Sequence, residues 1–144
     1  PAGWQVWPLA PERIGPVLSP RHARFDVLRS GPPRTLLDEP LLHTASRPQA
    51  WPRWLASHRL TDAPRLGTGF DHLTYLLEAA VAGLGVAIAP RELVQADLDS
   101  GRLVAPWGFA DTGGTWALCA ARGNPDARIP LLADWLRRDL LSAD

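Results

Sequence analysis

The stretch FDHLTYLLEAAVAGLGVAIAP, residues 70–90, decides the fold that this sequence predicts. Leucine and alanine at positions 73, 76, 77 and 80 place one apolar stripe on a helix, and Val81 and Leu84 continue it. Asp71 stands where a helix is capped, and Gly83 where a helix ends in a left-handed residue. Residues 86–89 form a short apolar strand that Pro90 stops. Helix, glycine turn and buried strand in this order are typical of an α/β sheet.

The loop before this helix is the first candidate binding site. A strand is expected over residues 64–69, and the loop then carries Thr68, Gly69, Phe70, Asp71 and His72. The first backbone N–H groups of the helix and the positive end of its dipole suit a small carboxylate or a similar polar ligand. The alternative is that Asp71 only caps the helix, in which case its negative charge opposes an anion.

Thr44 and Ser46 are a second pair of candidates. They close a predicted strand that begins at Leu41. Ligands of α/β folds bind beyond the carboxyl ends of strands, which is where this pair lies. Hydrogen bonds within the local turn are the alternative role for both hydroxyl groups.

Further helices and strands are expected around this unit. Strands are predicted over residues 14–18, 103–105 and 115–121, the last apolar enough to be central, with a turn at Gly113 and Gly114 before it. Helices are predicted over residues 51–58, 91–100 and 130–141. The apolar positions of the second of these helices are Leu93, Val94, Ala96 and Leu98.

Composition narrows the class of protein. The 144 residues suit one domain or half of a two-lobed domain, and fifteen arginines balance fifteen acidic residues, so no electrostatic footprint for nucleic acid or membrane is present. The lone Cys119 fits a reducing compartment, and no stretch is long and apolar enough to span a bilayer. The absence of methionine indicates a processed chain or an excised fragment, and we favour the fragment.

Motifs for catalysis and for cofactor binding are missing. The four histidines are isolated and the serines lack a GxSxG frame, so neither a metal site nor a nucleophile is predicted. The glycines of GLGVAIAP follow a helix and open a strand, which is the wrong order for a dinucleotide fingerprint. A P-loop is excluded because the chain has no lysine. We therefore expect no catalytic residue, metal or cofactor.

Several segments in order resemble the effector-binding domain of LysR-type transcriptional regulators, with the glycine cleavage activator-like subgroup as the best match. They are LLDEPLLHT, AWPRWL, EAAVAGLGVAIAP, LVQADLDSGRLVAPW and PLLADWLRRDL. The resemblance implies an α/β, periplasmic-binding-protein-like lobe with a mixed, mostly parallel sheet flanked by helices. Residues 16–109 are then the second lobe, and residues 110–144 return to a largely absent first lobe. The DNA-binding domain is absent.

The resemblance also implies partners and sites. A small-molecule effector lies between the two lobes, against the residues named above, and Trp116 falls near an aromatic position that faces it; a buried core position is the alternative for this tryptophan. Family members form homodimers or homotetramers, so Tyr75, Ala79 and Ala82 are the interface candidates. DNA is bound only through the missing N-terminal winged helix-turn-helix.

The sequence therefore predicts the regulatory domain of a cytoplasmic transcription factor, without enzymatic activity and without contact with a membrane. Effector binding would favour one arrangement of the lobes, which the oligomer transmits to DNA. Two alternatives remain open. One is a solute-binding protein that serves transport, and the other is a small α/β enzyme with Asp71 and His72 as acid and base.

Overall fold

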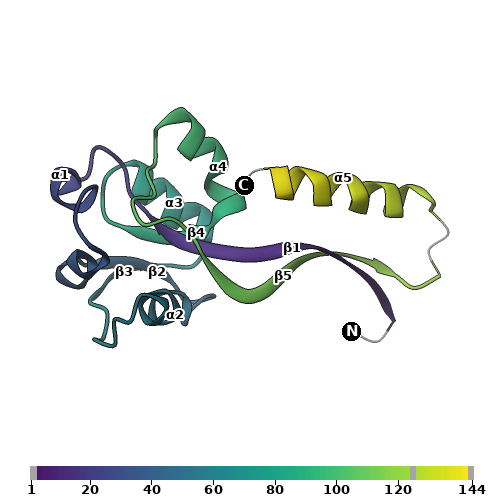
Figure 1. The fold of residues 1–144 in the computed structure, drawn as a ribbon, viewed down its shortest axis with the longest axis horizontal. Coiled ribbons are helices and arrows are strands. Elements are labelled where there is room, and N and C mark those ends of the chain that lie inside the picture. The colour runs from purple at the N-terminus through teal and green to yellow at the C-terminus, as the bar shows by residue number, and fades with distance from the viewer. Residues whose placement is uncertain (1–2, 124–125, 143–144) are drawn as a thin grey trace. The chain divides into compact units, whose positions relative to one another are not determined.

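The chain divides into two units in a computed structural model that describes residues 3–123 and 126–142. Unit 1 comprises residues 1–12 and 111–144, and unit 2 comprises residues 13–110. Strand β1 (Trp4–Val17) begins in unit 1 and ends in unit 2, and strand β5 (Ala110–Ala121) begins at the last residue of unit 2 and continues in unit 1. Figure 1 shows the order of the elements along the chain.

The predicted helix, glycine turn and strand are present in unit 2. Helix α3 (Leu73–Val81) is followed by Gly83, whose φ is +84°, and then by strand β4 (Ala87–Pro90). Two hydrogen bonds close the helix: Gly83 N donates to Ala80 O, and Leu84 N donates to Ala79 O over 3.0 Å. These are the two bonds of a Schellman motif, which requires the left-handed conformation that glycine adopts without strain.

The beginning and the end of the apolar stripe differ from the prediction. Helix α3 begins at Leu73 with His72 as its N-cap, and no side chain caps it, so the expected cap by Asp71 is wrong. Leu76 and Ala80 are buried as predicted, but Leu84 is 73% exposed. The Schellman turn carries Leu84 off the helical stripe, because residues beyond the C-cap no longer follow the 3.6-residue period.

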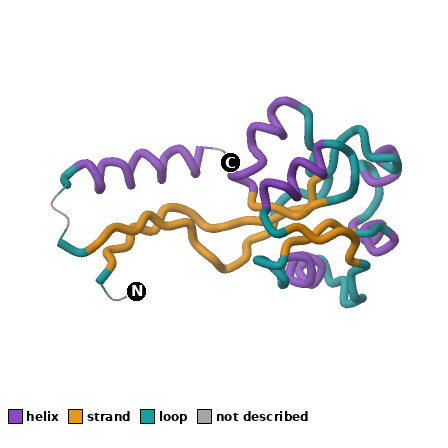
Figure 2. Tube along the Cα trace, turned by 180° about the vertical axis from the view of Figure 1, so that it is seen from behind, coloured by secondary structure: helices purple, strands orange, loops and turns teal. Residues whose placement is uncertain are grey.

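Two helices cover opposite faces of a short parallel sheet in unit 2. Strand β2 (Leu41–Thr44) pairs with strand β3 (Leu66–Phe70). Leu41 packs with Trp51 and Trp54 of helix α2 (Ala50–Ser57), whereas Leu42 packs with Leu76 of α3. Successive side chains of a strand point to opposite faces, so one strand serves both cores. Figure 2 shows helices on both sides of the strands in this unit.

The remaining elements of unit 2 enclose these two cores. They are α1 (Phe25–Leu28), the 3₁₀ helix η1 (Pro33–Asp38), and α4 (Arg91–Ser100), which ends at Gly101 with φ +78°. Val94 of α4 is buried, but Leu93 and Ala96 are exposed, so two of its four predicted core positions are wrong. The strand expected over residues 103–105 is reduced to a single bridge between Leu18 and Val104.

Strands β1 and β5 are longer than predicted. Among the described strands the sheet order is β4-β1-β5, so β5 lies at an edge instead of at the centre. It begins before Gly113 and Gly114, so the turn predicted there is wrong. Strand β4 pairs only with Ile14–Val17 of β1, so the earlier part of β1, which contains prolines 8 and 11, needs no ladder bond toward β4.

Helix α5 (Arg128–Ser142) completes unit 1. Asp126 precedes it and accepts hydrogen bonds from the backbone N and the guanidinium of Arg128, which lower the pKa of the Asp126 carboxyl. Ala133 is buried, whereas several large apolar side chains of unit 1 are exposed: Trp4, Val6, Leu131, Leu132, Trp135 and Leu141. Unit 1 thus keeps a broad apolar surface, and such surfaces mark places where another segment or protein packs.

Candidate functional site

The carboxyl ends of β2 and β3 bring most of the predicted site residues together. Thr44 is paired with Phe70 in the parallel register, so the loops after the two strands leave the sheet next to one another. Ser46 follows the first strand, and Asp71 and His72 follow the second. Neighbouring loops at the carboxyl ends of parallel strands are where α/β folds bind ligands.

Three of the predicted residues lie in a strand instead of a loop. Thr68, Gly69 and Phe70 belong to β3, because pairing with β2 extends the strand to Phe70. The side chain of Phe70 is half-buried and packs against the core that α3 shares with Leu42. The loop itself is therefore only two residues long, Asp71 and His72.

The second strand and its loop expose polar groups. Thr68, Gly69, Asp71 and His72 are all exposed, and the His72 ring tilts toward Tyr75 with 5.7 Å between ring centroids. On the β2 side, Thr44 is only 5% exposed and accepts a hydrogen bond from Ser46 Oγ over 3.2 Å. The hydrogen bond between Thr44 and Ser46 that was the alternative role for these hydroxyl groups is thus present. The Thr44 hydroxyl is buried, whereas the polar residues of β3 and the loop after it are exposed.

A small hollow of about 10 Å³ lies at this end of the sheet, between α2 and α3. Its walls are His43, Thr44, Arg47, Ala50, Trp51, Leu76 and Ile88. This volume admits a water-sized group and nothing larger. The sequence analysis missed His43, Arg47 and Trp51; the signal that could have found Arg47 is its position directly after Ser46 in the same loop.

His43 fixes the adjacent strand by packing over its glycines. Its Nε2 lies 3.1 Å from Gly67 O, and a Cβ atom at Gly69 would lie 2.8 Å from its Cε1. Any side chain at position 69 would therefore contact the His43 imidazole. Glycine is required here because the imidazole packs closely on the backbone of β3, and not because the backbone has a positive φ.

Replacing Gly69 by alanine is expected to destabilise the protein by about 1–2 kcal/mol, because the imidazole must leave Gly67. The double variant Gly69→Ala/His43→Ala should cost less than the sum of the two single changes, because the clash is gone. Urea unfolding of the three variants measures this coupling. Strictly additive losses would show that the imidazole does not oppose a side chain at position 69.

Trp116 and the interface candidates lie elsewhere. Trp116 is half-buried on β5 in unit 1. On α3, Tyr75 is 60% exposed and Ala82 just beyond the helix is exposed, whereas Ala79 is only 8% exposed and belongs to the core. A surface contact through this helix would thus use Tyr75 and Ala82 more than Ala79.

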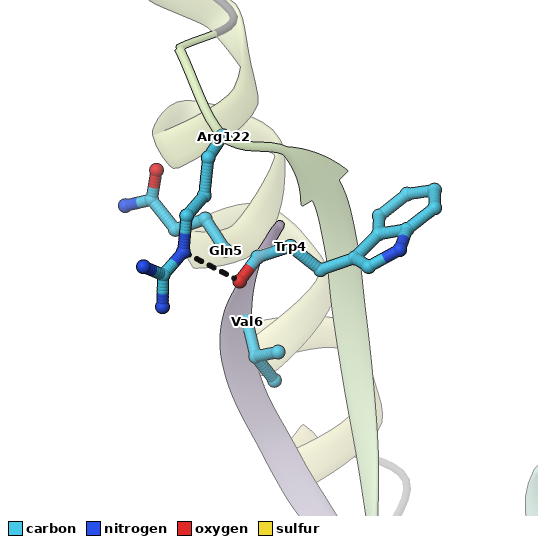
Figure 3. Close-up of a pocket in the computed structure, with 4 residues that line it drawn as sticks. All are labelled: Trp4, Gln5, Val6 and Arg122. Carbon is cyan, nitrogen blue, oxygen red and sulfur yellow. Dashed lines mark hydrogen bonds between the residues drawn. The ribbon is translucent and has the colours of Figure 1, made fainter. Parts of the chain in front are cut away.

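A larger hollow in unit 1 contains none of the predicted site residues. It has a volume of about 450 Å³ and is lined by Trp4, Gln5, Val6 and Arg122. Arg122 Nε donates to Trp4 O over 3.2 Å, while the Trp4 indole points away from the guanidinium (Figure 3). The hollow is a surface concavity beside the exposed apolar side chains of Trp4 and Val6.

The described residues contain neither a metal-binding cluster nor a membrane-spanning helix. No cluster of three or more histidine, cysteine or carboxylate side chains able to hold a metal ion occurs in residues 3–123 and 126–142. Over the same described residues, no helix has both the length and the apolar character needed to cross a bilayer.

Comparison with known proteins identifies the family. Residues 1–141 match the LysR substrate binding domain. The HTH-type transcriptional regulator TrpI of Pseudomonas aeruginosa is 60% identical over 141 residues, which cover 97% of this chain and 48% of TrpI. The glycine cleavage system transcriptional activator of Escherichia coli K12 is 34% identical over 112 residues, covering 73% of this chain and 34% of that protein. Resemblance to that subgroup is therefore weaker than resemblance to TrpI.

Solved structures show the same fold. The AmpR effector binding domain from Citrobacter freundii matches with a TM-score of 0.75 and 26% identity, over 98% of this chain and 70% of that one. The effector domain of Pseudomonas aeruginosa AmpR matches with a TM-score of 0.76 and 24% identity, over 99% and 68%. These relatives are transcriptional regulators and not enzymes, and the chain spans about half the length of TrpI. The chain belongs to the LysR family, as an effector-binding domain of the α/β, periplasmic-binding-protein-like fold.

Proposed function

We propose that this chain is the sensing part of a DNA-binding transcriptional regulator and that a small polar effector binds at the carboxyl ends of β2 and β3. The observation that carries the proposal is the pairing of Thr44 with Phe70, which sets the two candidate loops side by side. Exposed polar residues on one loop and a buried hydroxyl on the other offer hydrogen bonds to a ligand. The names of TrpI and of the glycine cleavage activator favour regulation over transport.

Unit 1 is one part of a first lobe that further strands and helices complete in the whole protein. The exposed apolar side chains of β1 and α5 support this part of the proposal, since they are a surface on which further strands and helices pack. Trp116, on a strand of the same unit, is the residue that we place on the first-lobe side of the effector. Residues 16–109 form the second lobe in this scheme, and residues 110–144 return to the first.

Transmission to DNA requires an assembly. We place the homodimer contact on the face of α3 that carries Tyr75 and Ala82, with Ala79 beneath it, and a homotetramer is the larger alternative. DNA is bound by an N-terminal winged helix-turn-helix in the whole protein, which acts in the cytoplasm. Effector binding shifts the population of dimer arrangements, and a coupling free energy of about 1–3 kcal/mol is sufficient.

The proposal is tested with a variant that places a bulky side chain at the exposed carboxyl end of β3. In the full-length protein, Thr68→Trp is expected to keep DNA binding but to reduce the effector-dependent change in transcription about fivefold or more, because the indole covers the exposed end of β3. RNA sequencing of a strain without the gene, complemented with each variant, finds the regulated promoter and measures its response. Binding of the purified protein to that promoter is measured by electrophoretic mobility shift.

Thr61→Trp is the matched control. Thr61 is exposed and precedes the amino end of β3, so the same bulky ring there leaves the proposed site open. A wild-type response from Thr68→Trp, or an equal loss from Thr61→Trp, rejects the site. Failure of the full-length protein to regulate any promoter rejects the function.

A further inference from the structure

Helix α5 has one face that packs against β1 and an opposite face that is exposed. Ala133 is 1% exposed, and the 3.6-residue period places the partly buried Leu136 and Leu140 on the same face. Arg137 holds this face against the strand, because its Nη2 donates to Pro8 O over 2.7 Å and its Nε donates to the same oxygen over 3.2 Å. Figure 2 shows the helix on one side of the strands of unit 1. The opposite face of α5 is thus turned away from these strands.

This outward face carries a regular row of side chains. Leu131, Asp134, Arg138 and Leu141 are spaced by three, four and three residues, which is the spacing of positions a and d where two helices pack along their length. We call these four residues the outer seam of α5. Leu131 is 67% exposed, Leu141 is 48% exposed, and Trp135 beside them is 55% exposed. Large apolar side chains gathered on one exposed helix face indicate that another helix covers them.

The charges in the outer seam fit a second copy of the same helix. In an antiparallel pair, Leu131 meets Leu141 of the second copy, and twofold symmetry repeats the contact. The same arrangement places Asp134 against Arg138 of the second copy, again twice. Arg138 is exposed and makes no ion pair within the part of the chain that the structure describes. A parallel pair would instead oppose like charges at both positions, so the seam is complementary to itself in the antiparallel direction alone.

We propose that the outer seam of α5 packs antiparallel against the same seam of a second copy of this chain. This inference rests on the proposed function, because it supplies the second contact that a homotetramer needs besides the dimer contact on α3. Helix α3 belongs to unit 2 and α5 to unit 1, so each contact has its own surface on the chain. Two different twofold contacts on each copy build a closed tetramer.

The rest of the first lobe has other side chains of unit 1 to cover. Leu132 is 46% exposed and lies on the flank of α5, between the face that packs on β1 and the outer seam. Trp4 and Val6 are exposed on β1 itself. Helices and strands that extend the sheet beside α5 meet these three side chains, whereas the outer seam remains on the surface of the lobe.

The experiment measures the assembly of the full-length protein by sedimentation velocity over a series of concentrations. Arg138→Asp is expected to raise the dissociation constant of the tetramer into dimers about tenfold or more, because the two seams then oppose like negative charges. Asp134→Arg should weaken the tetramer similarly, because the seams then oppose like positive charges. An equimolar mixture of the two variants should recover the tetramer, since the acidic seam of one variant faces the basic seam of the other.

Arg53→Asp is the matched control, because it makes the same change of charge at an exposed arginine of α2, outside α5. Circular dichroism of each variant checks that the fold is kept. Weaker assembly of both seam variants, with recovery in the mixture, supports the inference. A wild-type protein that stays dimeric at every concentration, a seam variant that assembles normally, a mixture without recovery, or an equal loss in Arg53→Asp overturns it.

The assembly measurements and the promoter measurements fail independently. If the seam variants assemble as the wild type does while Thr68→Trp still reduces the promoter response, this inference is wrong and the proposed function stands. Failure of the full-length protein to regulate any promoter rejects the proposed function, whereas recovery in the mixture is measured on purified protein and requires no promoter.

Discussion

Replacing Trp54 with alanine is expected to lower the free energy of unfolding by about 3–5 kcal/mol. Trp54 is 1% exposed in the core between α2 and β2, where it stacks on His58 with 3.9 Å between ring centroids and meets Trp107 edge-on. Deletion of the indole leaves a cavity that this close-packed core cannot fill without moving several elements. Urea unfolding followed by circular dichroism measures the loss.

Phenylalanine at the same position separates packing from hydrogen bonding. Trp54 Nε1 is buried and has no hydrogen-bond partner among the described residues, so Trp54→Phe removes volume but no bond. Trp51 is equally buried, but its Nε1 donates to Leu42 O over 2.9 Å. Trp51→Phe should therefore cost about 1 kcal/mol more than Trp54→Phe. If Trp54→Phe is the more costly change, the indole of Trp54 has a polar role that the structure does not show.

The same core shows what a single sequence can predict. Trp51, Trp54 and Leu55 follow the helical period, and α2 buries all three. The unit from α3 to β4 was also predictable, because Gly83 and the apolar stripe are local signals. Asp71 was mistaken for a cap because capping residues are recognised by type, whereas the pairing of β3 with β2 sets where the helix begins.

Long-range pairing accounts for the larger errors. Strands β1 and β5 pair across about a hundred residues, as the bond from Thr112 Oγ1 to Glu12 O shows, and no local pattern reports such a contact. Glycines 113 and 114 are typical of a turn, yet the strand contains them. At the site, hydroxyl groups at strand ends were predictable from α/β topology, but the hollow was not, since its walls come from β2, α2, α3 and β4.

Gly15 is the second position where a small change should have a large effect. It lies in β1 opposite Ala89 of β4, and a Cβ atom there would collide with the backbone carbonyl of Gly108 and the ring of Phe109. A carbonyl held by the main chain cannot swing aside as the tip of a side chain can. We expect Gly15→Ala to cost about 3 kcal/mol or more, above the usual range for an added methyl group.

Gly101→Ala distinguishes this close approach from backbone conformation. Gly101 has a φ of +78° and open space where its Cβ would lie, so alanine there meets only the strain of the left-handed region, about 1–2 kcal/mol. Gly15 has no such backbone requirement, and its whole penalty comes from contact with residues 108 and 109. Urea unfolding should rank Gly15→Ala well below Gly101→Ala in stability. If Gly101→Ala is instead the less stable variant, residues 108 and 109 move away from β1 when a methyl group is added at Gly15. Their close approach to Gly15 then does not limit the residue at position 15.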